Sequence, residues 1–156
     1  MTETGIIRNA HIDDLEHIIT IEQQCFKDDH AYSPQQLKYL LTKANSLTLV
    51  ETKENIIRGF VIILLRKGTH IAGLETIDVA PLFQKQGIAL QLLTAAEEEL
   101  KRKNIKMIRL EVSVTNHQAI QLYQKQGYTK TKILKNYYQY NHDGSKDAFR
   151  MIKKLR

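Results

Sequence analysis

The sequence is 156 residues long, with 42% hydrophobic and 26% charged residues. This composition excludes a disordered chain and predicts a single globular domain over residues 1–156. The formal net charge of +6 is scattered over small lysine and arginine clusters. Those clusters are explained either by solvated faces and a basic helix end, or by attraction of an acidic ligand such as a phosphorylated cofactor or RNA.

The location of the protein is indicated by three further features. The longest apolar run, Phe60–Leu65, has the length of a strand and is too short to cross a membrane. The first residues, MTETGIIRN, lack the basic region and apolar stretch of a signal peptide. The single cysteine, Cys25, excludes an internal disulfide and is most simply a core residue. We therefore expect a cytoplasmic protein with no membrane partner.

The first half of the chain alternates between helix and strand patterns. GIIR (5–8) predicts a short strand, and apolar residues at helical spacing after Asp13 predict a helix with that residue as its N-cap. The motif SPQQ (33–36) is a strong start signal for a second helix. The stretch 47–67 is typical of a hairpin that turns at Glu54-Asn55.

The second half continues this alternation without a linker or repeat. It predicts a strand over about Leu74–Val79, a helix over Gly87–Lys103, a strand over 105–114, a helix over His117–Gln126 that ends at Gly127, and two strands around the turn His142–Ser145. The resulting fold class is mixed α/β (α+β), with a largely antiparallel first half.

The turn between the predicted strand and the long helix, VAPLFQKQGIAL (79–90), suggests an anion site. The residues Gln86, Gly87, Ile88 and Ala89 lie near a helix N-terminus, where backbone amides are unpaired and the helix dipole favours negative charge. Gly87 permits close backbone approach. The stretch lacks the Gly-Lys-Ser/Thr of a P-loop and the repeated glycines of a dinucleotide fingerprint. A plain strand-to-helix connection explains the local residues equally well.

Two motifs together resemble the GNAT N-acetyltransferases. Val79-x-Pro81-x-x-Gln84-x-x-Gly87-x-Ala89 resembles their pyrophosphate loop, and LEVSVTNHQAIQLYQKQGY (110–128) resembles their second conserved block. The resemblance implies a GNAT-type fold, which is a mixed, mostly antiparallel central sheet flanked by about four helices. It also implies acetyl-coenzyme A (acetyl-CoA) as co-substrate. It further implies that the cofactor is bound by Ile77, Asp78, Val79, Lys85, Gln86, Gly87, Ile88, Ala89, Leu90 and Asn116.

Further residues resemble the branch of that family that acetylates protein N-termini, especially the bacterial ribosomal-protein-alanine N-acetyltransferases. They are Glu111, Asn116, Tyr123, Asn136-Tyr137-Tyr138 and Asp147-Ala148. The resemblance implies that Glu111 is the general base, that Tyr123 is the general acid, and that a protein N-terminus, such as that of a ribosomal protein, is the partner. The chain departs from the branch at Gln86, where many members have arginine, and at Gln139-Tyr140, which replaces a proline.

The chemistry of acetyl transfer fits these residue types. An α-amine, with a reference pKa of about 7.7–8.0, loses its proton more readily than lysine at about 10.4. A carboxylate such as Glu111 is sufficient to accept that proton, and a phenol such as Tyr123 can return one to the departing sulfur. A backbone amide near Val79 would polarise the carbonyl. The alternatives are that Glu111 is a strand-end charge, that Tyr123 is a core residue, and that Glu75 or Asp78 is the base.

The acceptor is the least determined part of the prediction. The resemblance implies that Tyr137 and Tyr138 bind substrate on one side of a groove, with the loop Phe26–Ser33 on the other. Cross-strand aromatic packing explains the tyrosines equally well. That loop carries Lys27, Asp28, Asp29 and His30, which either attract an amine or form a solvated surface. A small-molecule amine or an internal lysine is the rival acceptor, and a non-catalytic RNA- or protein-binding module is the rival function. The histidines show no metal-ligand spacing, so we expect no metal. We also expect no direct contact with nucleic acid.

Overall fold

A single seven-stranded sheet with the order β1-β2-β3-β4-β5-β7-β6 forms the centre of the molecule. The computed structural model describes residues 5–26 and 30–156. The strands are β1 (Ile6–Asn9), β2 (Ser46–Lys53), β3 (Ile56–Leu65), β4 (Ile71–Val79), β5 (Met107–Ser113), β6 (Thr129–Leu134) and β7 (Ala148–Lys154). All neighbouring strands are antiparallel except β4 and β5. The predicted fold class is confirmed.

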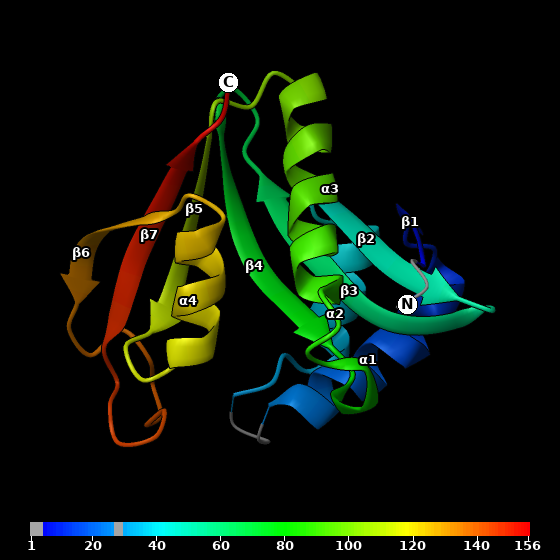
Figure 1. Ribbon diagram of the computed structural model, residues 1–156, viewed down its shortest axis with the longest axis horizontal. Helices are drawn as coiled ribbons and strands as arrows, with labels where there is room; N and C mark the ends of the chain where they lie inside the picture. Colours follow the sequence, from blue (N-terminus) through cyan, green and yellow to red (C-terminus); the bar gives the residue numbers. More distant parts are fainter. Residues whose placement is uncertain (1–4, 27–29) are drawn as a thin grey trace.

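Helices cover both faces of this sheet (Figure 1). They are α1 (Leu15–Cys25), α2 (Pro34–Thr42), α3 (Ile88–Arg102) and α4 (His117–Lys125), with short 3-10 turns at Ile12–Asp14 and Pro81–Phe83. Among the described residues, no helix combines the length and the apolar character that a membrane crossing requires.

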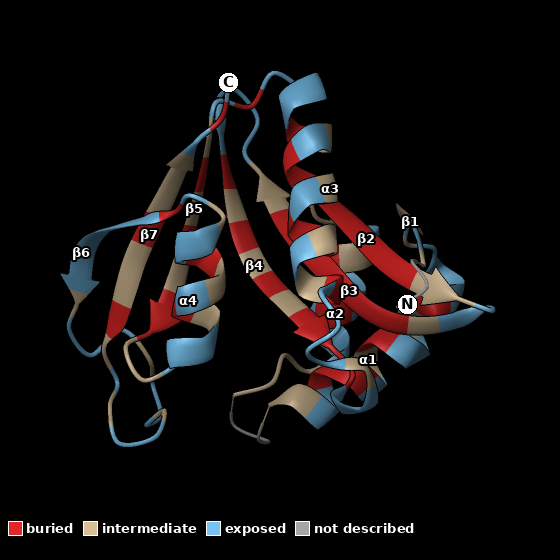
Figure 2. Cartoon of the chain, in the orientation of Figure 1, coloured by how far each residue is buried: buried red, intermediate tan, exposed pale blue. Residues whose placement is uncertain are grey.

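The core has two parts, one on each face of the sheet. Alternate residues of a strand point to opposite faces: Val61 and Ile63 of β3 pack with α3, whereas Phe60 and Ile62 pack with α1 and α2. Tyr123 of α4 belongs to the cluster on the α3 face. Figure 2 shows the buried residues concentrated along the central strands and in a stripe on α3.

The parallel strands β4 and β5 pair only at their beginnings. Ile71, Ala72 and Gly73 face Met107, Ile108 and Arg109, and beyond these three pairs the strands diverge (Figure 1). A bulge in β4 contributes to this geometry, because the register with β3 skips Glu75 between Leu74 and Thr76. Bulges bend a strand and redirect side chains. The backbone of β4 after Gly73 therefore borders a gap in the sheet.

Local sequence signals explain most element boundaries. Ser33 Oγ accepts a hydrogen bond from Gln36 N at 3.1 Å, while the Gln36 side chain accepts one from Ser33 N, so the predicted capping box starts α2. Glu54 and Asn55 both have positive φ, at 52° and 63°, as a two-residue hairpin turn requires.

Two predicted boundaries were wrong. The helix α1 begins at Leu15 and Asp13 is not its cap, because Asp14 accepts a hydrogen bond from His11 N at 2.7 Å and pairs with Arg8, which holds Ile12–Asp14 in a 3-10 turn. The strand β4 begins at Ile71 and not near Leu74, because its first residues pair with β5.

Candidate active site

The turn after β4 is shaped by backbone conformation. Lys85 and Gly87 have left-handed φ values of 65° and 83° on either side of Gln86. Such an alternation turns successive amides toward one concave surface that suits an anion. The side chain of Gln84 fixes the turn to the strand, because its Nε2 donates to the carbonyl oxygen of Val79 at 2.9 Å.

The first turn of α3 adds further amide donors at the same place. Its first intrahelical bond runs from Gln91 N to Gly87 O, so the amides of Ile88, Ala89 and Leu90 have no carbonyl partner within the helix. A Cβ atom built on Gly87 meets nothing within 4 Å, so the space above these amides is open. The residues of this turn therefore fit a phosphate-bearing ligand. Of the residues predicted to bind the cofactor, those of the turn and the start of α3 are the ones whose backbone amides lie together.

The remaining predicted cofactor residues border the gap between β4 and β5. Ile77, Asp78 and Val79 form the end of β4, past the last pair with β5. Asn116 lies before α4 and caps that helix, because its Oδ1 accepts a hydrogen bond from Ala119 N at 3.2 Å. The capping interpretation of Asn116 is thus confirmed, while contact with a cofactor stays a prediction.

A groove of about 320 Å³ lies where β4 and β5 begin to diverge. It is lined by Tyr32, Leu64, Arg66, Thr69, Ile71, Ala72, Gly73, Leu74, Glu75, Arg109, Glu111, Tyr137 and Tyr138. The groove therefore brings together residues from the loop before α2, from both diverging strands and from the loop between β6 and β7. Both tyrosines that were predicted to bind substrate are among them.

Two glutamates in this groove each accept a hydrogen bond from a tyrosine. Tyr32 donates its hydroxyl to Glu75 Oε2 at 2.5 Å, and Tyr137 donates to Glu111 Oε1 at 3.3 Å. Burial, followed by the charge of the partner carboxylate, raises the pKa of Tyr137. Both phenols therefore stay protonated and available as donors at neutral pH.

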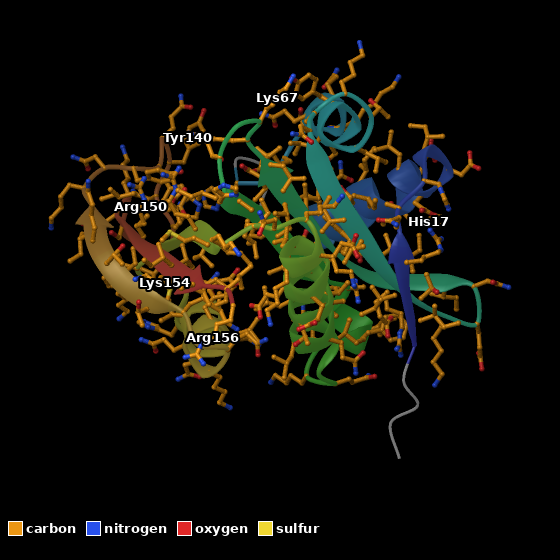
Figure 3. The ribbon with its side chains drawn as sticks, turned by 90° about the horizontal axis from the view of Figure 1, so that it is seen from above. His17, Lys67, Tyr140, Arg150, Lys154 and Arg156 are labelled. Atoms are coloured by element: carbon orange, nitrogen blue, oxygen red, sulfur yellow. The ribbon has the colours of Figure 1, made fainter. Side chains whose placement is uncertain are left out.

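The two glutamates differ in their cationic neighbours. Arg150 of β7, labelled in Figure 3, donates from Nε to Glu111 Oε2 at 3.1 Å, and Arg109 Nε lies 3.6 Å from the same oxygen. Glu75 has no salt-bridge partner among the residues that the structure describes. Glu111 lies within β5, so it is not a strand-end charge.

Tyr123 lies on the α3 face of the sheet. Its side chain is 5% exposed and belongs to the core cluster on the α3 face, with its ring 5.7 Å from that of Tyr128. Within residues 5–26 and 30–156, no hydrogen-bond partner of the Tyr123 hydroxyl is found. Burial, then the charges of Asp78 and Tyr138, raise the pKa of Tyr123. A core position and a role as proton donor are therefore compatible for this residue.

The two loops beside the groove touch each other. The rings of His30 and His142 stack with their centroids 3.8 Å apart, and Tyr138 lies 4.0 Å from His142. Of the loop residues that were predicted to attract an amine, Lys27, Asp28 and Asp29 lie outside the described residues. His30 therefore connects the loop before α2 to the loop between β6 and β7.

Several site residues were not predicted from the sequence. Among them are Tyr32, Arg109 and Arg150 around the two glutamates, and Glu22, which is buried on α1 and accepts a hydrogen bond from Tyr32 N at 2.9 Å. A signal for Glu22 was present, because it follows Ile18 at the spacing of one helical turn and so lies on the buried stripe of α1. No pattern within the sequence indicated Tyr32 or Arg150, whose partners are 43 and 39 residues away.

Comparison with known proteins places this geometry among acetyltransferases. The acetyltransferase (GNAT) family matches residues 12–128. The N-alpha-acetyltransferase of Saccharolobus solfataricus is 31% identical over 96% of this chain and 92% of its own. The ribosomal protein bS18-alanine N-acetyltransferase of Haemophilus ducreyi is 38% identical over 67% of this chain and 70% of its own. The crystal structure of the ribosomal-protein-S18-alanine N-acetyltransferase from Escherichia coli is similar with a TM-score of 0.87, 27% identity, and coverage of 97% of this chain and 94% of that chain.

Proposed function

Because the chain belongs to the acetyltransferase (GNAT) family, we propose that it transfers the acetyl group of acetyl-CoA to the N-terminal α-amine of a protein. The chain is an acyltransferase by this family membership, and the acceptor and the residue roles are our proposals. The observation that carries the acceptor assignment is the groove between the two contacting loops, with Glu75 and Glu111 inside it.

Acetyl-CoA would be held by the turn after β4 and by the edges of the gap. The amides from Lys85 to Leu90 suit its pyrophosphate, since they lie in a concave turn and at the positive end of the α3 dipole. The end of β4 (Ile77–Val79) and Asn116 border the gap on either side. Bound there, acetyl-CoA supplies the acetyl group as a thioester and leaves as a thiol.

The groove suits the end of a peptide chain. A protonated α-amine is attracted by the carboxylates of Glu75 and Glu111, and the rings of Tyr137 and Tyr138 supply flat contact surface for the following residues. The relatives named as N-alpha-acetyltransferase and as ribosomal protein bS18-alanine N-acetyltransferase support this acceptor class. A ribosomal protein is our preferred acceptor for the same reason.

We assign the general base to Glu111 and the general acid to Tyr123. Glu111 is held in one orientation by Tyr137 and Arg150, so it can accept a proton from the amine directly or through one water. Tyr123 faces the gap from the α3 side and keeps its proton until transfer, because its pKa is raised. Glu75, which has only Tyr32 as a side-chain partner in the described structure, is the alternative base.

We further propose that residues 1–156 form a single N-acetyltransferase domain and that the protein acts in the cytoplasm. Strands β6 and β7, which end at Lys154, complete the same sheet that contains residues 12–128 of the family match. The single cysteine, Cys25, carries a thiol that donates to the carbonyl oxygen of Val79, as expected where thiols stay reduced.

A direct test is an acetyl-transfer assay with three acceptors, read by mass spectrometry. The first is a peptide with a free, small N-terminal residue. The second is the same peptide with a blocked N-terminus and one lysine, and the third is spermidine. We expect efficient transfer to the first and little to the others. Equal or faster transfer to the blocked lysine peptide or to spermidine would overturn the N-terminal assignment and leave the fold and the family unchanged.

A further inference from the structure

Two carboxyl side chains, Glu22 of α1 and Asp78 of β4, are buried together beside the gap. Glu22 is 1% exposed and Asp78 is 2% exposed. One oxygen of each carboxyl has a donor: Tyr32 N donates to Glu22 Oε2 at 2.9 Å, and Thr76 Oγ1 donates to Asp78 Oδ1 at 2.7 Å. The other two oxygens, Glu22 Oε1 and Asp78 Oδ2, have no hydrogen-bond partner among the described residues.

Among the described residues, no cation is found beside this carboxyl pair. The groups that face it are the thiol of Cys25 on α1, Tyr32 before α2, the hydroxyl of Thr76 on β4 and Tyr123 on α4. None of these four is a cation. A buried pair of carboxyl groups does not stay fully ionised without a compensating cation. Burial and the neighbouring Glu22 accordingly raise the pKa of Asp78 well above its ordinary value.

The carboxyl pair lies close to the proposed general acid. Asp78 lies near the end of β4, and its neighbour Val79 belongs to the same core cluster as Tyr123. The charge of Asp78 also contributes to the raised pKa of Tyr123. Asp78 Oδ2 has no hydrogen-bond partner among the described residues. A buried phenol that gives up its proton needs a source from which to regain it, and this carboxyl pair is a titratable group beside it on the β4 side.

We propose that Glu22 and Asp78 share one proton and that this proton restores the Tyr123 hydroxyl during each transfer. The proposal rests on the proposed function. The Tyr123 O–H bond breaks and its proton ends on the departing thiol. The O–H bond of the carboxyl pair then breaks, and its proton re-forms the Tyr123 O–H. Water returns a proton to the pair when the products leave. Glu22 and Asp78 act through Tyr123 and are therefore positioning residues.

Stability measured against pH tests the shared proton without any acceptor. Above the ordinary carboxyl pKa values of about 3.9–4.3, the unfolded chain has lost both protons while the folded chain keeps one. Stability therefore falls as pH rises, and this proton contributes about a tenfold loss in the folding equilibrium constant per pH unit until the raised pKa is reached.

The amide variants Asp78→Asn and Glu22→Gln keep the contact but remove the titratable proton. We expect each to lower the pH slope of urea unfolding between pH 5 and pH 7 by one proton relative to the natural chain. Thr48→Val is the matched control, because it deletes another buried oxygen without a partner, on β2, and should keep the natural slope. Unchanged slopes in both amide variants would overturn the shared proton.

Turnover tests the second half of the proposal. Glu22→Gln, which lies outside the proposed cofactor site, should bind acetyl-CoA normally. Both amide variants should lower kcat on a free N-terminal peptide by about the 10² typical of a lost proton-transfer group, and lose the alkaline fall of kcat that ionisation of the pair causes. Full kcat with an unchanged pH profile in a folded Asp78→Asn protein would reduce the pair to a structural role. Failure of the proposed function is distinguishable, because it appears as inactivity of the natural chain while the unfolding slopes remain.

Discussion

The two faces of the sheet meet at the gap between β4 and β5 but are built differently. On the α3 face, the turn from Lys85 to Gly87 and the start of α3 form a surface made of backbone amides, and the buried phenol of Tyr123 belongs to the core on that face. On the α1 face, the groove consists of side chains from several distant segments. The difference indicates that the α3 face is suited to a ligand common to a whole family, and the α1 face to an acceptor that varies.

Charge is also arranged differently on the two sides of the gap between β4 and β5. On the β5 side, the carboxylate of Glu111 is compensated by Arg150 and Arg109. On the β4 side, Asp78 and Glu22 are compensated by a proton in our proposal. The β5 side thus keeps a fixed carboxylate, which suits a base, and the β4 side keeps a releasable proton. The following variants test that division, from the largest expected effect to the smallest.

Removing the phenol on the α3 face should have the largest effect. Tyr123→Phe keeps the buried ring and its packing beside Tyr128, but deletes the hydroxyl of the proposed general acid. We expect kcat to fall by roughly 10²–10⁴ with unchanged affinity for acetyl-CoA, measured by steady-state kinetics and calorimetric titration. Tyr128→Phe is the matched control on the same face, since the hydroxyl of Tyr128 is engaged by Glu97 Oε2 at 2.9 Å. Normal turnover of the Tyr123 variant would assign this residue to the core alone.

The glutamates of the groove form the second test. Glu111→Gln should lower kcat by about 10² and flatten the acidic limb of the pH–rate profile, because the group whose protonation produces that limb is gone. Glu75→Gln is the paired variant from the β4 side and should change kcat less. The opposite ranking, with a near-normal rate and pH profile for Glu111→Gln, would transfer the role of base to Glu75.

The backbone turn on the α3 face is tested by its glycine. Gly87→Val adds a side chain at φ 83° in the space above the amides, and we expect at least a tenfold loss of acetyl-CoA affinity together with a conformational cost of about 1–2 kcal/mol. Gly68 is a matched control, since it has a φ of 81° and equally open space around it at the other end of β4. Gly68→Val should lose similar stability and keep full affinity. Equal affinities in the two folded variants would contradict the phosphate assignment.

The parts of this architecture that the sequence predicted are those that depend on near neighbours along the chain. The capping box at Ser33, the turn at Glu54-Asn55 and the cap at Asn116 each involve residues within three positions. The motif at 79–90 likewise predicted a strand, a turn and a helix in the right order. Resemblance to a family predicted the mixed sheet, which no local pattern could order.

The parts that sequence patterns could not predict depend on distant residues. The bulge that redirects Glu75 exists only through the register of β4 with β3. Arg150 reaches Glu111 because β5 and β7 are neighbours in space, and Tyr32 reaches Glu75 across two elements. The charge environment of each glutamate, and therefore the choice of a base, is a property of tertiary packing.

The smallest effect is expected for the thiol on the β4 side. Burial, then the charges of Asp78 and Glu22, raise the pKa of Cys25 to about 12, so the nucleophilic thiolate is scarce at pH 8. Relative to an ordinary thiol with a pKa of about 8.5, alkylation of Cys25 at pH 8 should be slower by about 10³, and its rate should rise about tenfold per pH unit. Cys25→Ala should keep kcat within a few-fold. A large loss of kcat in that variant, or fast alkylation that abolishes transfer, would mean that the β4 side works through a covalent thiol and not through the carboxyl pair.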